Sequence, residues 1–120
     1  MNKILIVGQN PSAQKPRKNS TFDRLQRWCD EMNVDDFDFI NCIDSVGDYT
    51  KLEINKDNIQ NSTRNRDKII ALGNFSSDTL SKLGIDHFKM PHPSPRNRKL
   101  NDKEFEKKMI NECKNYLQIN

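Results

Sequence analysis

The sequence predicts a three-layer α/β/α fold built on a four-stranded parallel sheet. Three observations favour this class: strand-like apolar runs alternate with helix-like patterns, the strand-like runs are short, and the chain is 120 residues long. A hydrophobic fraction of 33% suits one core of two or three layers. Right-handed crossovers between parallel strands place the loops that follow the strands along one edge, where ligands bind. We therefore expect residues 1–120 to form a single domain with its binding loops at that edge.

The first half of the chain predicts a strand, a helix and a second strand. Residues 3–7 hold a short apolar run that ends at Gly8, which is typical of a strand buried on both faces. After a polar loop, Ser20 can cap a helix that ends near Asn33, because apolar residues recur there at helical spacing. Residues 37–43 predict the second strand.

The second half of the chain predicts two more strands and two helices with clear sequence signals. Residues 45–65 are highly polar and indicate a loop with a weak helix. The remaining elements, in chain order, are a strand over residues 68–72, a helix that opens at Ser76 or Ser77 and stops at Gly84, a short strand over residues 86–90, and a helix over about residues 101–117.

Composition restricts the class of protein. The chain has 20 Lys and Arg against 17 Asp and Glu, a net charge of +3 that excludes a histone-like binder but permits one local basic face. Three widely spaced cysteines offer neither a disulfide framework nor a CxxC motif, which favours a reducing compartment. No apolar run approaches the ~20 residues of a membrane span, and no signal peptide follows Met1. We expect a cytoplasmic protein, bacterial or in a viral host, that is complete from Met1 and does not bind membranes.

Two of the loops that follow strands carry amide side chains suited to binding. Gly8 permits a tight turn, and Pro11 stiffens the loop so that the Asn10 side chain is held in place. An ordinary turn without a ligand is the alternative, and a phosphate-binding loop is disfavoured because no glycine-rich phosphate motif is present. Asn41 ends a strand, where its amide either caps the strand or offers a donor and an acceptor to a planar heterocycle.

The segment over residues 92–99 is both stiff and basic. Two prolines flank Ser94, His92 can donate a hydrogen bond to a developing anion, and three cations follow. Such a loop can bind phosphates, although a rigid basic surface loop is the alternative. His87, on the preceding strand, is expected to be a structural residue.

These two loops resemble the signature motifs of the uracil-DNA glycosylase superfamily. Residues 8–12 read Gly-Gln-Asn-Pro-Ser, similar to the Gly-x-Asn-Pro loop of the mismatch-specific and single-strand-selective branches, with the glutamine of the main branch's Gly-Gln-Asp-Pro form. Residues 92–97 read His-Pro-Ser-Pro-Arg-Asn, like the loop of the single-strand-selective branch. Residues 39–41 and 69–73 are similar to two strands of the family, so the resemblance covers nearly the whole chain.

The resemblance implies a monofunctional DNA glycosylase that flips uracil or a related pyrimidine out of DNA and hydrolyses its N-glycosidic bond. His92 would donate a hydrogen bond to uracil O2 as negative charge develops, and Asn10 would position the attacking water. Because Asn10 is not a strong general base, catalysis would depend on stabilising the leaving group. The resemblance also implies that the base is bound by Asn41, Phe22 and the backbone near Gln9. Ser94 would bind a flanking phosphate, and Arg96 would fill the space that the flipped base leaves in the stack. The full set of implied DNA-binding residues is Ser12, Ser94, Arg96, Arg98 and Lys99.

The resemblance also implies a monomer that uses neither a metal nor another cofactor, since three scattered cysteines exclude the four-cysteine iron-sulfur branch. The chain is shorter than typical members and lacks their N-terminal helices. Residues 13–19 have no clear match to the segment that bears the base-stacking aromatic, for which Phe22 is the nearest candidate. Phe22 also fits the apolar stripe of the first helix, so core packing is the alternative.

Two other functions are compatible with these residues. One is a non-catalytic module of the same fold that holds DNA or a partner protein. The other is an enzyme that acts on another nucleobase or nucleotide, for instance in DNA modification, because a shared fold does not fix the substrate.

Overall fold

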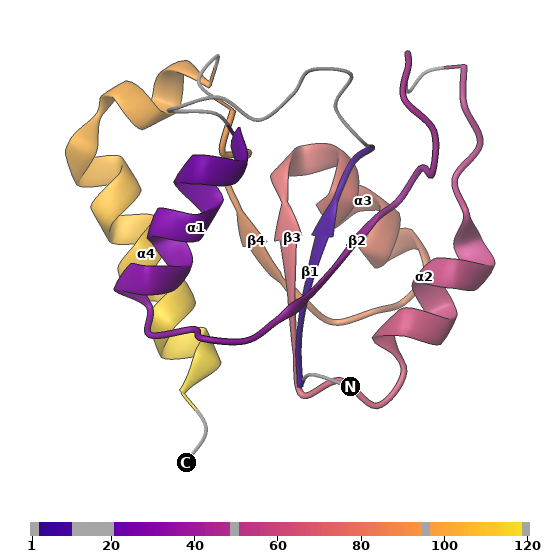
Figure 1. Ribbon diagram of the computed structural model, residues 1–120, viewed down its shortest axis with the longest axis horizontal. Helices are drawn as coiled ribbons and strands as arrows, with labels where there is room; N and C mark the ends of the chain where they lie inside the picture. Colours follow the sequence, from indigo (N-terminus) through magenta and orange to yellow (C-terminus); the bar gives the residue numbers. More distant parts are fainter. Residues whose placement is uncertain (1–2, 11–20, 49–50, 95–96, 119–120) are drawn as a thin grey trace.

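The computed structural model describes residues 3–10, 21–48, 51–94 and 97–118, and it has the expected α/β architecture (Figure 1). All four strands are parallel and belong to one sheet, in the order β2-β1-β3-β4. The elements in chain order are β1 (Ile4–Gly8), α1 (Thr21–Glu31), β2 (Asp38–Asn41), α2 (Lys56–Thr63), β3 (Lys68–Leu72), α3 (Gly73–Lys82), β4 (Phe88–Met90), a 3₁₀ turn η1 (Arg98–Asn101) and α4 (Lys103–Leu117).

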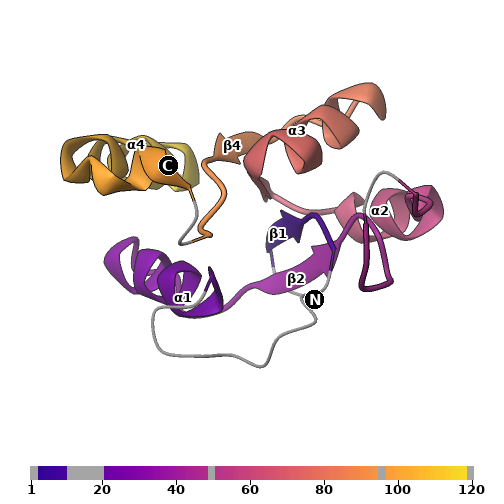
Figure 2. The same ribbon diagram turned by 90° about the horizontal axis from the view of Figure 1, so that it is seen from above.

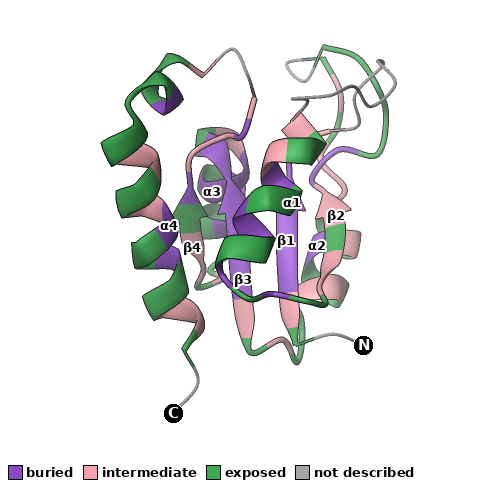
Figure 3. Cartoon of the chain, turned by 60° about the vertical axis from the view of Figure 1, so that its left-hand side comes forward, coloured by how far each residue is buried: buried purple, intermediate pink, exposed green. Residues whose placement is uncertain are grey.

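The helices cover both faces of the sheet. Figure 2 shows α1 and α4 on one side of the strands and α2 and α3 on the other. The two central strands, β1 and β3, are buried along almost their whole length (Figure 3). This burial on both faces explains why their sequences are continuous apolar runs instead of alternating patterns.

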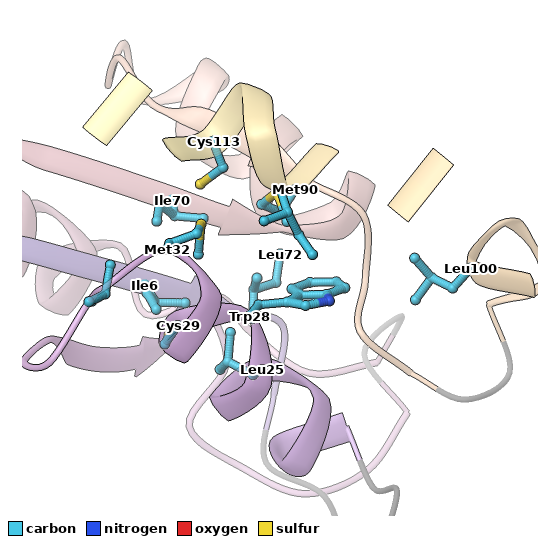
Figure 4. Close-up of a cluster of buried hydrophobic side chains, with 12 residues drawn as sticks. Ile6, Leu25, Trp28, Cys29, Met32, Ile70, Leu72, Met90, Leu100 and Cys113 are labelled. Carbon is cyan, nitrogen blue, oxygen red and sulfur yellow. The ribbon is translucent and has the colours of Figure 1, made fainter. Parts of the chain in front are cut away.

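Each face of the sheet has its own core. Side chains of β1 alternate between the two faces, so Ile6 packs under α1 and α4, whereas Leu5 and Val7 pack under α2 and α3. The core under α1 and α4 is drawn in Figure 4 and contains Leu25, Trp28, Cys29, Met32, Ile70, Leu72, Met90, Leu100 and Cys113. Within the described residues, no helix is long and apolar enough to cross a membrane.

The strand register brings the carboxyl ends of all four strands to one edge. Gly8 at the end of β1 pairs with Asn41 at the end of β2, and Leu72 at the end of β3 pairs with Met90 at the end of β4. The loops after the strands therefore leave the sheet together, at the top of Figure 1.

Helix α3 begins earlier than the sequence predicts. The expected start was Ser76 or Ser77, but the helix begins at Gly73, directly after β3. Gly73 has φ +87°, a conformation that glycine adopts without strain, and this permits a turn from strand to helix with no intervening loop. Ser76 and Ser77 lie inside the helix and are buried, so neither is its N-cap.

The other differences concern the ends of elements. Strand β2 is shorter than residues 37–43 and β4 shorter than residues 86–90. The last helix begins at Lys103 and not near residue 101, because Asp102 is its N-cap and accepts hydrogen bonds from the amides of Glu104 and Phe105. A separate 3₁₀ turn precedes it, and the weak helix expected within residues 45–65 is α2.

Candidate functional site

Most of the site residues predicted from the sequence lie at the edge of the sheet where the four strands end. Gln9 and Asn10 follow β1, Asn41 ends β2, and His92 lies two residues beyond β4. With neighbouring strands about 4.8 Å apart, the ends of β2 and β4 lie about 14 Å from each other across β1 and β3. The candidate site is therefore wide, with Asn41 at one side and His92 at the other. Ser12 and Arg96 lie outside the described residues.

Gly8 leaves room for the Asn41 side chain. A Cβ atom added at Gly8 would lie 2.8 Å from Asn41 Oδ1 and 2.8 Å from Phe39 Cζ, closer than real Cβ atoms approach other groups. The Asn41 amide and the Phe39 ring thus both lie against the bare backbone at the end of β1. Phe39 is 43% exposed on the edge strand β2, and its ring belongs to neither core.

Asn10 is held by the loop that follows β2. Its Nδ2 donates hydrogen bonds to the carbonyl oxygens of Ser45, at 3.3 Å, and Gly47, at 2.9 Å. Because both acceptors are carbonyl oxygens, the amide nitrogen must face the loop, and Oδ1 is turned the other way. Asn10 therefore joins two loops and presents an acceptor oxygen whose direction is fixed.

His92 is held as a neutral imidazole. Its Nδ1 accepts a hydrogen bond from the backbone N–H of Ser94 at 3.1 Å, so this nitrogen carries no proton. The proton of the neutral ring is then on Nε2, which becomes a donor. Burial lowers the pKa of His92, which also favours the uncharged form. The site consequently contains an uncharged N–H donor at neutral pH.

Two further residues fix the position of His92. Asn97 Nδ2 donates to the His92 carbonyl oxygen at 2.9 Å, and Asn97 Oδ1 caps η1 by accepting from the Lys99 amide. Gly73 packs against the ring, since a Cβ there would lie 3.2 Å from His92 Cβ and 3.3 Å from Cδ2. Neither of these roles is predicted from the sequence. An asparagine just before a helical turn was the available signal for Asn97.

The remaining predicted residues lie around this edge in different environments. Ser94 is half-buried beside His92, whereas Arg98 and Lys99 are exposed on η1. Phe22, in the first turn of α1, is 59% exposed and does not belong to the core, so the core-packing alternative is wrong. An exposed ring in the first turn of α1 is available for a ligand.

His87 is a structural residue, as predicted. Its Nε2 lies 2.7 Å from Ser77 Oγ and its Nδ1 lies 2.8 Å from the Ile85 carbonyl oxygen. Both ring nitrogens are thus occupied by neighbours from α3 and the segment before β4, away from the sheet edge.

The cysteines are buried thiols of the two cores. Burial raises the pKa of Cys29 to about 11 and that of Cys113 to about 12, and burial also raises the pKa of Cys42. A raised pKa disfavours the thiolate that nucleophilic attack or metal binding requires. Among the described residues, no three His, Cys, Asp or Glu side chains are grouped so that they could hold a metal ion.

Comparison with known proteins gives one match. The sequence model of the uracil DNA glycosylase superfamily matches residues 1–118, almost the whole chain. Neither the curated proteins nor the solved structures give a match.

Proposed function

Because the chain belongs to the uracil DNA glycosylase superfamily, we propose that it is a glycosylase that hydrolyses the N-glycosidic bond of uracil or a related pyrimidine in DNA. The observation that carries this proposal is the state of His92, a neutral imidazole fixed by the Ser94 amide at Nδ1 with its donor at Nε2. In this reaction the bond between C1′ and the base nitrogen breaks, and the base leaves with the electron pair. An N–H donor is what the departing anion needs.

His92 would act on the leaving group. As the glycosidic bond lengthens, negative charge spreads onto the oxygen between the two ring nitrogens of the base, and the Nε2–H would donate to that oxygen. A fixed donor of this kind needs no reorganisation during the reaction, which is why such groups contribute about 2.7–4 kcal/mol to barriers. The imidazole keeps its proton throughout, so the step requires no acid.

Asn10 would act on the water that attacks C1′. With Nδ2 bound to the Ser45 and Gly47 carbonyl oxygens, Oδ1 is turned away from them and would accept a hydrogen bond from this water. An amide oxygen orients water but does not take its proton with the strength of a carboxylate. Water attack would then follow bond breaking, and the released proton would pass to solvent.

The other predicted residues are proposed to bind the substrate. Asn41 would pair with the edge of the flipped base, and backbone groups near Gln9 would line its pocket. A flipped base that makes one hydrogen bond of about 3 Å at each end of its ring would span most of the distance between Asn41, at the end of β2, and His92, beyond the end of β4. The exposed Phe22 ring would stack on the base. The residues proposed to contact the DNA strand are Ser12, Ser94, Arg96, Arg98 and Lys99, with Arg96 filling the vacated stack.

The contact between Gly8 and Asn41 provides a test of base binding. We expect Gly8→Ala to lower kcat/KM for uracil excision by about 10- to 100-fold, because the new methyl group would displace the Asn41 amide from its position and remove hydrogen bonds to the base. Stability should change little, since Gly8 does not have a positive φ. Excision kinetics and thermal unfolding measure the two effects. Unchanged kinetics in the folded variant would exclude a role for the Asn41 amide.

The activity itself is tested with uracil-containing oligonucleotides. Single- and double-stranded substrates with uracil, hydroxymethyluracil or a mismatched base are incubated with the protein and treated with alkali, which cleaves the strand where a base is missing. Cleavage that requires the protein supports the proposal. No cleavage of any substrate would refute it, and DNA binding without base release would identify the chain as a non-catalytic module. We further propose that the protein acts as a monomer in the cytoplasm.

A further inference from the structure

A hollow of about 350 Å³ lies beside His92 and is lined by residues of α3, β4, η1 and α4. β4 is an edge strand, with α3 and α4 on either side of it (Figure 2). His92 lines both this hollow and the candidate site, so the two are neighbours. The volume is near the lower limit for ligand sites, which suits one nucleotide and not a longer segment. The lining residues that bear on its chemistry are Gly73, Asn74, Lys89, Lys99, Phe105 and Met109.

The charge of the lining favours an anion. Lys89 on β4 and Lys99 on η1 are exposed, and none of the described residues that line the hollow is a carboxylate. Neither lysine forms a salt bridge with a described residue. Helix α3 also begins here with Leu72 at its N-cap, which provides no side-chain hydrogen bond. The partial positive charge of the helix N-terminus thus adds to that of the two lysines.

One wall of the hollow is apolar. Phe105 and Met109 lie one turn apart on α4, so they occupy the same face of that helix. Both are half-buried, which fixes them against the core while leaving part of each side chain accessible. Aromatic side chains at such positions stack on nucleobases, whatever the base. The lining therefore fits an occupant that combines negative charge with a flat apolar group.

We propose that this hollow binds a nucleotide next to the target on the same DNA strand, with Lys89 and Lys99 at its phosphate and Phe105 against its base. The proposal rests on the proposed function, because that function supplies the strand. Binding this neighbour would hold the strand at the sheet edge while the target base is out of the stack. Interaction with a nucleotide remote from the reacting bond could then offset the energy of unstacking.

The exposed position of Lys89 also has a simpler explanation, and the test must distinguish it from a phosphate contact. Charged side chains on short edge strands prevent pairing with other chains. A charge of either sign serves that purpose, whereas a phosphate contact requires a positive one. Lys89→Glu and Lys89→Arg therefore distinguish the two roles.

The test measures binding to DNA that contains no uracil, so that it does not depend on base release. A fluorescent single-stranded thymidine oligonucleotide is titrated with each variant over a series of salt concentrations. We expect Lys89→Glu to weaken binding about tenfold and to reduce the slope of log affinity against log salt by about one, because one phosphate contact is lost. Lys89→Arg should bind like the wild type. Lys114→Glu, at the exposed far end of α4, makes the same charge change and should have little effect.

Phe105→Leu tests the apolar wall. Leucine keeps much of the packing against the core but removes the ring, so we expect weaker oligonucleotide binding with an unchanged salt slope. Thermal unfolding confirms that the variant is folded. Wild-type affinity in this folded variant would overturn the placement of a base on Phe105.

Three results would overturn the subsite. One is an equal loss of binding in Lys89→Glu and Lys114→Glu, which would indicate only general attraction. The second is wild-type binding by Lys89→Glu. The third is that a Glu-Phe peptide binds more tightly than the oligonucleotide and that this peptide binding is lost in Lys89→Glu. That result would make the hollow a protein-binding site. If excision fails but the Lys89 effect on DNA is found, the proposed activity is wrong, and the hollow binds a nucleotide of a strand that the protein holds without removing a base.

Discussion

Replacing His92 with alanine is expected to lower kcat/KM for uracil excision by about 10²- to 10³-fold. This is the loss that follows removal of one fixed donor to a developing anion. The side chain contacts Gly73 and the Ser94 amide, so the variant should remain folded and should still bind DNA. Excision is measured in single-turnover reactions, in which slow product release does not hide the chemical step.

The second histidine provides a matched control. His87→Ala removes the same side chain, but His87 bonds to Ser77 and Ile85, away from the sheet edge. We expect this variant to unfold at a lower temperature and, when folded, to excise uracil at nearly the wild-type rate. If His92→Ala were as active as His87→Ala, His92 would have no part in the reaction.

The pH dependence follows from the protonation state of His92. Burial lowers its pKa below the ordinary value of about 6.5, so the ring is neutral above that pH. A neutral Nε2–H donor persists as the pH rises, and excision should therefore not decline between about pH 6.5 and pH 8.5. A protonated histidine acting as an acid would instead lose activity over this range. A decline that His92→Ala abolishes would contradict the neutral donor.

The same pKa shift predicts an effect on stability. In the unfolded chain His92 binds a proton near pH 6.5, but in the folded protein it does so only at lower pH. The unfolded state thus gains protons first as the pH falls, and the free energy of unfolding decreases below about pH 6.5. Above that pH both states are unprotonated and His92 contributes no slope. Urea unfolding of wild type and His92→Ala at several pH values measures the difference.

The fold is predictable because its strongest signals are local. The apolar runs of β1 and β3 are continuous since both strands are covered on both faces, and each run ends at a glycine that begins the next turn. The start of α3 differs from the prediction for a local reason too: Ser76 and Ser77 are good capping residues, but Gly73 turns the chain directly from strand to helix. Tertiary burial of the two serines then overrides their capping preference.

The candidate site is predictable only in part. The sequence indicates which residues gather at the sheet edge, because parallel strands end together. It does not indicate what holds them, since those contacts join distant segments. Asn10 bonds to carbonyl oxygens 35 and 37 residues away, and the fit of Asn41 depends on the missing side chain of Gly8 on another strand. Such contacts follow from register and loop path, which residue types alone do not fix.

Asn10 gives the second prediction with a large effect, and it separates two roles of one side chain. Asn10→Ala should lower kcat/KM by about 10²-fold, because both the acceptor for water and the bonds to the Ser45 and Gly47 carbonyl oxygens are lost. Asn10→Asp keeps an acceptor and adds a stronger base, yet it replaces the donor that faces the two carbonyls with an oxygen. Asn111→Asp, exposed on α4, controls for the added charge.

We expect Asn10→Asp to be about tenfold less active than the wild type, not more active. A carboxylate opposed by two carbonyl oxygens has no donor to meet them, so either the side chain turns away or the Ser45–Gly47 loop moves, and in both cases the water loses its position. Faster hydrogen exchange of the Ile43 amide, which donates to the Gln9 carbonyl oxygen at 2.9 Å, would report release of this loop in both Asn10 variants. If Asn10→Asp instead excised uracil faster than the wild type, proton removal from water would limit the reaction, and the two amide bonds would be dispensable.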